Sequence, residues 1–277
     1  MTKDYYDGLK EKCRELRYQI VDMVGDFGVG HIGGSLSIVE ALATIYYTHM
    51  RIDPKNPKLD GRDRFVLSKG HAGPALYAIL ADKGFFDKKM LYTLNRPDTL
   101  LPSHVDMLRT PGIDMTTGSL GQGLSCAVGI AMGARLKKDG ALVFTILGDG
   151  ESQEGQIWEA ALYAAQMKLD NLYAFTDVNG LQVDGTVDEI NSLQPLDKKW
   201  EAFGWHVITV SGHDLQQIDE AINQAKSVHG KPKMIILKTV KGKGVSFIEE
   251  AGAPNHNMVL TKEQHEAALL EIKGGQV

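Results

Sequence analysis

The chain has 277 residues, of which 43% are apolar, with a formal net charge of −5 and a pI near 6.0. This length and apolar fraction are sufficient for a sizeable core in one α/β domain, so we expect a single domain over residues 1–277. Nothing in this acidic balance resembles the charge of a nucleic-acid-binding protein. The sequence has no run of about 18 apolar residues, so no membrane span is expected.

The first part of the chain combines amphipathic helices with glycine-rich loops. Helices are predicted at 4–25, 38–49 and 73–83, and a strand is predicted at 64–67. Ser35 or Ser37 is expected to cap the helix that follows the glycine loop at 28–34. Residues 95–118 carry no periodic pattern, and ordered loops of this length usually have a function.

From residue 119 onward, predicted helices and strands alternate. Strands are predicted at 141–147, 172–177, 205–210 and 233–238, and helices at 121–137, 154–167, 195–202, 214–228 and 261–272. This alternation indicates an α/β fold with a mainly parallel central sheet and helices on both faces. Such sheets bind ligands beyond the carboxyl ends of their strands.

Two of those strand ends carry residues that predict a metal-bound diphosphate. Gly148-Asp149-Gly150 follows one strand, and Asn179 follows the next. The residues between them, 151–178, suffice for one helix and one strand, so adjacent parallel strands would bring Asp149 and Asn179 together. Mg²⁺ prefers oxygen ligands, here the Asp149 carboxylate, the Asn179 amide and the Leu181 carbonyl. The glycines let backbone approach phosphate, near the positive end of the predicted helix 154–167.

The two cysteines, Cys13 and Cys126, have no metal-binding spacing. Their number and placement are typical of reduced thiols, and the N-terminal segment lacks the apolar stretch of a secretory signal. We therefore expect a cytoplasmic protein.

The Gly-Asp-Gly…Asn pattern resembles the thiamine diphosphate signature, and the rest of the chain resembles the N-terminal half of transketolases. The matching stretches are in family order: GHIGGSLS (30–37), LSKGHAGPALYA (67–78), TTGSLGQGLS (116–125), GDGESQEGQIWEA (148–160), DVNGLQVDG (177–185) and KTVKGKGVSF (238–247). The resemblance implies the thiamine diphosphate-binding fold and, as cofactors, thiamine diphosphate with Mg²⁺ or Ca²⁺.

The resemblance also implies the roles of individual residues in holding the cofactor. The metal would be held by Asp149, Asn179 and the Leu181 carbonyl, and the diphosphate would lie against Gly148, Gly150 and His71. The segment Gly118, Ser119 and Leu120 matches the part of the family that cups the cofactor. Glu154 matches a glutamate at a subunit interface, on a polar path between two active sites.

Histidines are expected to line the substrate channel. His31, His71 and His104 match family histidines, and the unperturbed pKa of histidine is near neutral, which suits proton transfer to and from sugar hydroxyls. His256 stands where the family has a histidine that reaches diphosphate or substrate, but its surroundings depart from the usual spacing, so its place in the site is left open. Lys241 and Lys243 are expected to be solvated.

The resemblance covers only the first of the domains that full-length transketolases carry. In the family, the following pyrimidine domain supplies the glutamate that activates the cofactor and much of the sugar-phosphate site. We therefore expect that the partner is a separate C-terminal transketolase subunit, that the substrates are sugar phosphates, and that the assembly is a heterotetramer with two copies of each chain.

Transfer of a two-carbon ketol unit from a ketose phosphate to an aldose phosphate is the leading hypothesis for function. One alternative is the α subunit of a 2-oxo acid dehydrogenase E1 component, which shares Gly-Asp-Gly…Asn but normally lacks the GHIGGSLS and LSKGHA pair. A deoxyxylulose phosphate synthase usually has a long, unsplit chain. A non-catalytic cofactor-binding subunit is a third alternative. A nicotinamide dehydrogenase is disfavoured because no GxGxxG follows a first strand.

Overall fold

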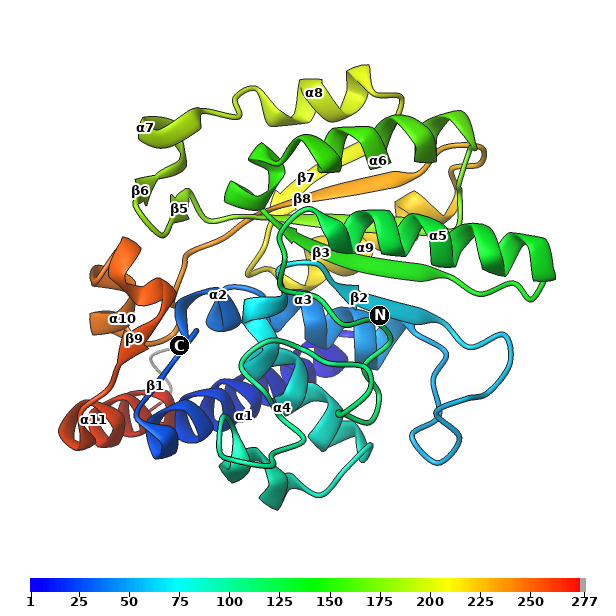
Figure 1. Cartoon of the computed structure of the whole chain (residues 1–277). Coiled ribbons are helices and arrows are strands. Elements are labelled where there is room, and N and C mark those ends of the chain that lie inside the picture. Colours follow the sequence, from blue (N-terminus) through cyan, green and yellow to red (C-terminus); the bar gives the residue numbers. More distant parts are fainter. Residues whose placement is uncertain (275–277) are drawn as a thin grey trace.

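A five-stranded parallel sheet forms the centre of the computed structural model, which describes residues 1–274 (Figure 1). Its strands, in spatial order, are β2 (Arg64–Leu67), β3 (Val143–Gly148), β4 (Leu172–Val178), β8 (Lys233–Lys238) and β7 (His206–Ser211). Every neighbouring pair is parallel. The predicted α/β class is confirmed. The last three residues of the predicted domain 1–277 lie outside the described residues.

The central strands are apolar along their whole length because both faces of the sheet are covered. In β3, Val143 to Leu147 are all buried, as is usual for strands of parallel sheets. Alternate side chains point to opposite faces. Phe144 and Ile146 pack into one core, and Val143 and Leu147 pack into the other.

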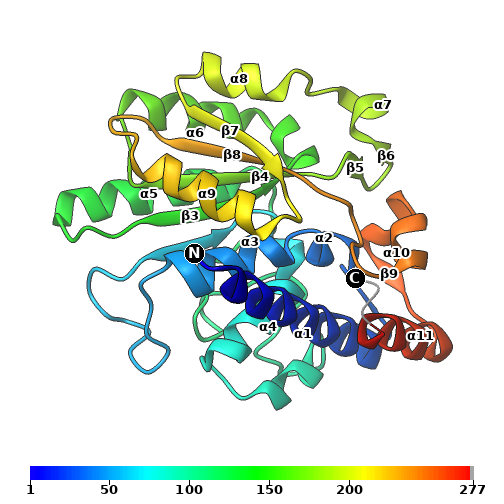
Figure 2. The ribbon, with the colours of Figure 1, turned by 180° about the vertical axis from the view of Figure 1, so that it is seen from behind.

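Helices cover the two faces, which Figures 1 and 2 show from opposite sides. One face carries α5 (Gln122–Lys137), α6 (Gly155–Gln166) and α8 (Leu196–Ala202). The other carries α1 (Lys3–Phe27), α3 (Val39–Thr44), α4 (Gly73–Lys83) and α9 (Leu215–Lys226), with α11 (Lys262–Lys273) packed along α1.

Shorter elements complete the fold. They are α2 (Gly33–Leu36), a π-helical turn at Ile45–His49, α7 (Val187–Asn191), α10 (Ser246–Glu250), and the antiparallel pairs β1 (Val29–Gly30) with β9 (Met258–Val259) and β5 (Leu181–Gln182) with β6 (Gly185–Thr186). The β5–β6 hairpin lies in a segment for which the sequence predicts neither a helix nor a strand. It places Leu181 directly after the end of β4.

The predicted serine caps are wrong. The helix α3 begins after Ile38, which makes no side-chain capping bond. Ser35 Oγ instead donates to the His31 carbonyl at 2.7 Å, and Ser37 Oγ donates to Asp177 Oδ2 at 2.7 Å. A local carbonyl therefore binds the Ser35 hydroxyl and a distant carboxylate binds the Ser37 hydroxyl, in place of the helix that the capping rule assigns to them.

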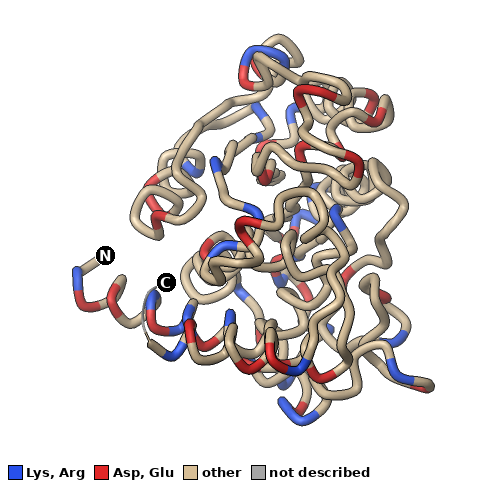
Figure 3. Tube along the Cα trace, turned by 90° about the vertical axis from the view of Figure 1, so that its left-hand side faces the viewer, with Lys and Arg blue, Asp and Glu red and all other residues tan. Residues whose placement is uncertain are grey.

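Among residues 1–274, no helix is both long enough and apolar enough to cross a membrane. Figure 3 shows Lys and Arg interspersed with Asp and Glu along the helix that starts at the N-terminus.

Candidate active site

The carboxyl ends of β3 and β4 place Asp149 beside the loop that carries Asn179. In the strand register Gly148 is opposite Asp177, and Asp149 N donates to the Asp177 carbonyl at 3.2 Å. The Asp149 carboxylate accepts from Gly150 N at 2.8 Å and from Gly180 N at 2.6 Å. The predicted adjacency of these two strand ends is confirmed.

Asp177 is a buried anchor that sets the orientation of Asn179. The Asn179 amide nitrogen donates to Asp177 Oδ2 at 2.9 Å, so its oxygen is free to accept from Leu181 N at 3.1 Å. Lys69 Nζ lies 2.5 Å from the same Asp177 oxygen. Although burial opposes ionisation, the Lys69 ammonium and neighbouring hydroxyls lower the pKa of Asp177 below its ordinary value.

A cavity of about 210 Å³ opens at these strand ends. Nine of the residues predicted from the sequence line it: His71, Leu120, Gly148, Asp149, Gly150, Glu154, Asn179, Leu181 and His256. The same cavity is lined by residues that sequence reasoning did not place there, notably Lys69, Glu151 and Lys241. His256, whose position was left open, therefore lies at this cavity.

Lys241 is buried, and the expectation that it is solvated is wrong. Its side chain is 3% exposed, and Nζ lies 3.3 Å from both the Leu181 carbonyl and His256 Nδ1. Burial, followed by repulsion from Lys69, lowers the pKa of Lys241 to about 8. Gly242 has a φ of +90°, a left-handed conformation that lets the loop turn tightly here.

The residues at the cavity fit a divalent cation. Burial, and then the nearby Asp177 carboxylate, raise the pKa of Asp149 to about 6, which indicates a carboxylate short of positive charge. Its two backbone hydrogen bonds leave lone pairs for a metal. No cluster of three or more His, Cys, Asp or Glu side chains suited to a metal occurs among residues 1–274. That result fits Mg²⁺, which is commonly bound by one or two carboxylates together with phosphate oxygens.

The same cavity fits an anionic ligand. Lys69 and Lys241 both line it. Gly34 and Gly150 leave room for a close approach, because a Cβ added at Gly34 would lie 3.3 Å from His71 Nε2 and one at Gly150 would lie 3.1 Å from Gln182 Cβ. Two cations and two close-approach glycines beside a buried carboxylate suit a diphosphate bound with its metal.

The four histidines named from the sequence form one cluster beside this cavity. The His31 ring centroid lies 5.6 Å from that of His71, 5.2 Å from His104 and 5.4 Å from His256. His71 and His256 are 4.6 Å apart. Residues from four separate segments of the chain therefore meet at one place.

Burial keeps this cluster uncharged at neutral pH. It lowers the pKa of His31 to about 4 and that of His256 to about 3, and neighbouring His and Lys side chains add to both effects. The pKa of His71 is lowered well below its usual range, mainly by burial and then by Lys69, and burial also lowers the pKa of His104. Neutral imidazoles can each accept one hydrogen bond and donate another, which suits contact with hydroxyl groups.

The whole architecture matches one family model. Residues 9–272 match the model described as transketolase, thiamine diphosphate binding domain. The chain belongs to this transketolase family. The predicted family and cofactor class are confirmed, and so is the predicted role of N-terminal transketolase subunit.

Two relatives of similar length are named as transketolase subunits. The chain is 55% identical over 265 residues to the 6-deoxy-6-sulfo-D-fructose transketolase subunit of a Clostridium species, covering 96% of each protein. It is 42% identical to an apulose-4-phosphate transketolase subunit of Phocaeicola vulgatus, covering 95% of this chain and 93% of that protein.

Full-length transketolases share the fold over part of their length. The solved structure from Campylobacter jejuni matches with a TM-score of 0.89 and 32% identity, over 99% of this chain and 43% of that one. The transketolase subunit thus spans less than half of the length of such enzymes.

Glu154 and Glu151 differ in environment within the transketolase subunit, although they are three residues apart. Glu151 is buried and accepts hydrogen bonds from Ser68 Oγ at 2.6 Å and from the backbone of Gly121 and Gly148 at 3.0 Å each. Glu154 is exposed at the edge of the cavity. Glu151 therefore holds the loop, while Glu154 is available to another molecule.

Of the three residues expected to cup the cofactor, Gly118, Ser119 and Leu120, only Leu120 lines the cavity. Gly118 instead abuts the histidine cluster, because a Cβ added there would lie 3.0 Å from His104 Cδ2. Ser119 is exposed and does not line the cavity.

Replacing His31 by asparagine is expected to weaken the pH dependence of stability of the transketolase subunit. The folded chain holds the pKa of His31 near 4, against an ordinary value of 6.5. As the pH falls below 6.5, the unfolded chain binds a proton that the folded chain does not, so stability is lost. Between pH 7 and pH 5 the wild type should lose ~1 kcal/mol more than the variant, after allowance for solvent screening.

Urea unfolding at both pH values measures this difference. His229→Asn, at an exposed position outside the cluster, should behave as the wild type. Equal losses in the wild type and the His31 variant would contradict the prediction.

Proposed function

We propose that the chain is the cofactor-binding subunit of a two-chain transketolase that transfers a two-carbon ketol unit from a ketose to an aldose phosphate. The observation that carries the proposal is the meeting of a buried carboxylate, two lysines and four neutral histidines at the carboxyl ends of β3 and β4. Thiamine diphosphate, when bound, supplies the electron sink for the carbanion.

The protein's own part is to hold and orient the cofactor. Asp149, the Asn179 amide oxygen and the Leu181 carbonyl would hold Mg²⁺ or Ca²⁺. Lys69 and Lys241 would balance the charge of the diphosphate, beside Gly148, Gly150 and His71. By resemblance to the family, the Gly118 carbonyl would accept from the pyrimidine amino group, and Leu120 would pack on the rings, with Ser119 between them.

The histidine cluster would handle the sugar. His31, His104 and His256 are neutral, so each can accept the proton of a sugar hydroxyl and afterwards return that same proton. Ser103 Oγ lies 3.4 Å from His31 Nδ1, which would leave Nε2 of His31 available to the substrate. Proton transfer of this kind typically contributes about 10²–10⁴-fold to a rate.

Two features support a partner chain at the surface formed by α5 and α6. Glu154 is exposed at the cavity edge. The helices α5 and α6 also expose large apolar side chains, Leu136, Leu162 and Tyr163, and Met167 is exposed directly after α6. Exposed apolar side chains gathered on neighbouring helices are typical of protein interaction sites. We propose a C-terminal subunit with the pyrimidine domain, in a heterotetramer with two copies of each chain.

For the donor, we propose a ketose with a terminal anionic group, phosphate or sulfonate. The relative named for 6-deoxy-6-sulfo-D-fructose is 55% identical, whereas the one named for apulose 4-phosphate is 42% identical. This difference favours the sulfonated ketose. A panel of 6-deoxy-6-sulfo-D-fructose, fructose 6-phosphate and apulose 4-phosphate, tested on the reconstituted two-chain enzyme, should give the highest kcat/KM with the sulfonated sugar. A higher value for either phosphate would overturn that choice.

Replacing His31 by asparagine is also expected to lower turnover far more than cofactor binding. In the two-chain enzyme kcat should fall about 100-fold or more, since one proton-transfer group is lost. The Kd for thiamine diphosphate should change less than threefold, about 0.6 kcal/mol. Steady-state kinetics and calorimetry measure the two quantities, with His229→Asn as the matched control. An unchanged kcat would remove His31 from the reaction.

A further inference from the structure

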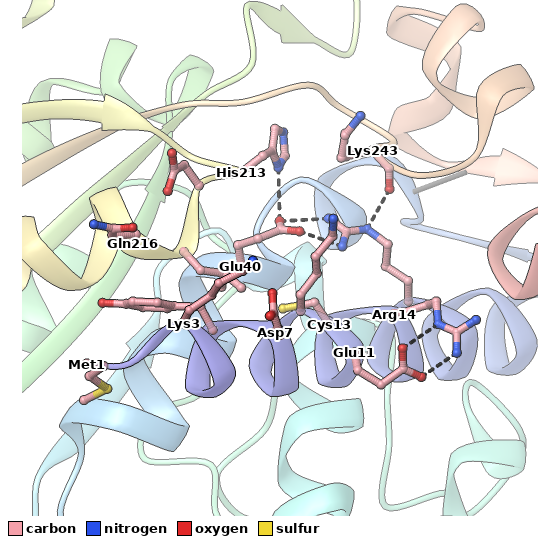
Figure 4. Close-up of a pocket in the computed structure, with 15 residues that line it drawn as sticks. Met1, Lys3, Asp7, Glu11, Cys13, Arg14, Glu40, His213, Gln216 and Lys243 are labelled. Atoms are coloured by element: carbon pink, nitrogen blue, oxygen red, sulfur yellow. Dashed lines mark hydrogen bonds and ion pairs between the residues drawn. The ribbon is translucent and has the colours of Figure 1, made fainter. Parts of the chain in front are cut away.

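A buried triad of charged and polar side chains lies outside the site described above. Arg17 on α1 pairs with Glu40 on α3 through two contacts, Nη1 to Oε1 at 2.6 Å and Nη2 to Oε2 at 2.8 Å. His213, in the loop between β7 and α9, approaches Glu40 Oε2 through Nδ1 at 3.0 Å. Figure 4 shows His213 and Glu40 facing each other, with Lys243 nearby.

The triad holds the loop 239–244 at two peptide groups. Val240 N donates to His213 Nε2 at 2.8 Å. Because Nε2 accepts, the ring proton is on Nδ1, and His213 donates it to Glu40. Arg17 Nε donates to the Lys243 carbonyl at 3.0 Å. The two bonded peptide groups lie on either side of Lys241.

Hydrogen bonds from other parts of the fold also hold the two residues between these peptide groups, Lys241 and Gly242. The Lys241 carbonyl accepts from Asn255 Nδ2 at 3.1 Å, and Gly242 N donates to the Gly33 carbonyl at 3.0 Å. Each residue from Val240 to Lys243 therefore has at least one backbone group bonded to a separate part of the fold. A backbone fixed in this way confines the side chain that starts from it.

The loop 239–244 separates two cavities. Lys241 lines the cofactor cavity of about 210 Å³. Lys243 lines another cavity of about 800 Å³, together with Arg17, Glu40 and His213. The two cavities have no lining residue in common. The triad thus contacts the loop from the side away from the cofactor cavity and does not touch that cavity itself.

A purely stabilising role does not account for this arrangement well. Arg17 and Glu40 are almost completely buried, with side chains 3% and 9% exposed. Removing two such charges from water is costly, so a buried ion pair is weak evidence for a gain in stability, and a role in specifying one conformation is the better-attested use. The conformation specified here is that of the backbone which carries Lys241.

We propose that Arg17, Glu40 and His213 are positioning residues that hold the loop 239–244 in the shape that lets Lys241 bind the diphosphate of the cofactor. The inference rests on the proposed cofactor site. Pre-organising a binding group strengthens binding because less freedom is lost when the ligand arrives. The triad should therefore act on cofactor affinity, through Lys241, and little on the chemical step.

Two substitutions at His213 separate its two hydrogen bonds. His213→Asn places an amide near the former Nδ1, so it can still donate to Glu40 but no longer accepts from Val240 N. His213→Gln places an amide near the former Nε2, so it can still accept from Val240 N. In the two-chain enzyme with Mg²⁺, we expect the Asn variant to raise the Kd for thiamine diphosphate about tenfold and the Gln variant to raise it less than threefold.

Matched measurements exclude a general loss of folding. Circular dichroism should show the same secondary structure in all variants, and kcat at saturating thiamine diphosphate should stay within twofold of the wild type. Gln216→Ala, which changes another residue of the 800 Å³ cavity, should leave Kd unchanged. A folded His213→Asn variant with wild-type Kd would overturn the inference, as would equal Kd values for the Asn and Gln variants.

A double-mutant cycle tests whether the triad acts through Lys241. In a Lys241→Ala background, His213→Asn should raise Kd less than twofold, because the group that it positions is already absent. A full tenfold further effect in that background would also overturn the inference. If the wild type itself fails to bind thiamine diphosphate, the proposed function fails instead, and the two failures are distinguishable.

Discussion

Replacing Asp149 by asparagine is expected to weaken the Mg²⁺-dependent binding of thiamine diphosphate about 100-fold, or ~2.7 kcal/mol. Asparagine has nearly the same size as aspartate and can still accept from the backbone of Gly150 or Gly180, so the fold should survive. It removes the one negative charge of the proposed ligand set, beside Asn179 and the Leu181 carbonyl. Calorimetry on the two-chain enzyme, with and without Mg²⁺, measures the effect.

Asp188→Asn provides the control for a change of charge alone. Asp188 is exposed on α7, where it accepts from Ser192 Oγ, and it does not line the cavity. Its substitution should change the cofactor Kd less than twofold. Wild-type affinity in the Asp149 variant would contradict the metal assignment. A folded wild-type enzyme that binds no thiamine diphosphate would favour a non-catalytic subunit.

Turnover is expected only when a partner subunit is present. Incubated alone with thiamine diphosphate, Mg²⁺, a ketose donor and an aldose phosphate, the chain should show no activity above the uncatalysed background. The physical reason is that this chain holds the diphosphate end, while the activating glutamate is expected on the pyrimidine domain of the partner. Addition of that partner should raise the rate by many orders of magnitude, as enzymes typically do.

The test needs each chain alone and the two chains mixed. Product formation followed by chromatography gives the rate, and size-exclusion chromatography with light scattering gives the stoichiometry, expected to be two copies of each. Robust turnover by this chain alone would refute the split arrangement. A mixture in which Glu154→Gln binds its partner normally but turns over more slowly would place Glu154 in the reaction path.

The helices and strands that could be predicted are those with a regular spacing of apolar residues in the sequence. The strand at 64–67 and the helix at 73–83 coincide with β2 and α4, because apolar periodicity reports directly on which side chains are buried. The same is true of the β8 strand at 233–238. The predicted caps are wrong because each hydroxyl has another partner: Ser35 donates to the preceding His31 carbonyl, and Ser37 donates to the distant Asp177 carboxylate.

The site residues that could be predicted are those in short sequence motifs shared with the family. Asp149, Asn179 and the histidines sit in such motifs, so the resemblance named them. Lys241 was missed because no rule of spacing gives the direction of a side chain in a glycine-rich loop. Asp177 was missed as an anchor because its partners, Lys69 and Ser37, lie more than 100 residues away.

The uncharged state of the four clustered histidines bears on how the choice of sugar could change. Neutral rings distinguish the positions of hydroxyl groups, but they offer no fixed positive charge to a sulfonate or phosphate at the far end of the chain of carbons. The partner subunit, on the other side of the substrate channel, would then distinguish a terminal sulfonate from a terminal phosphate. One cofactor module could thus serve different sugars, with a new preference gained by exchanging a single polypeptide.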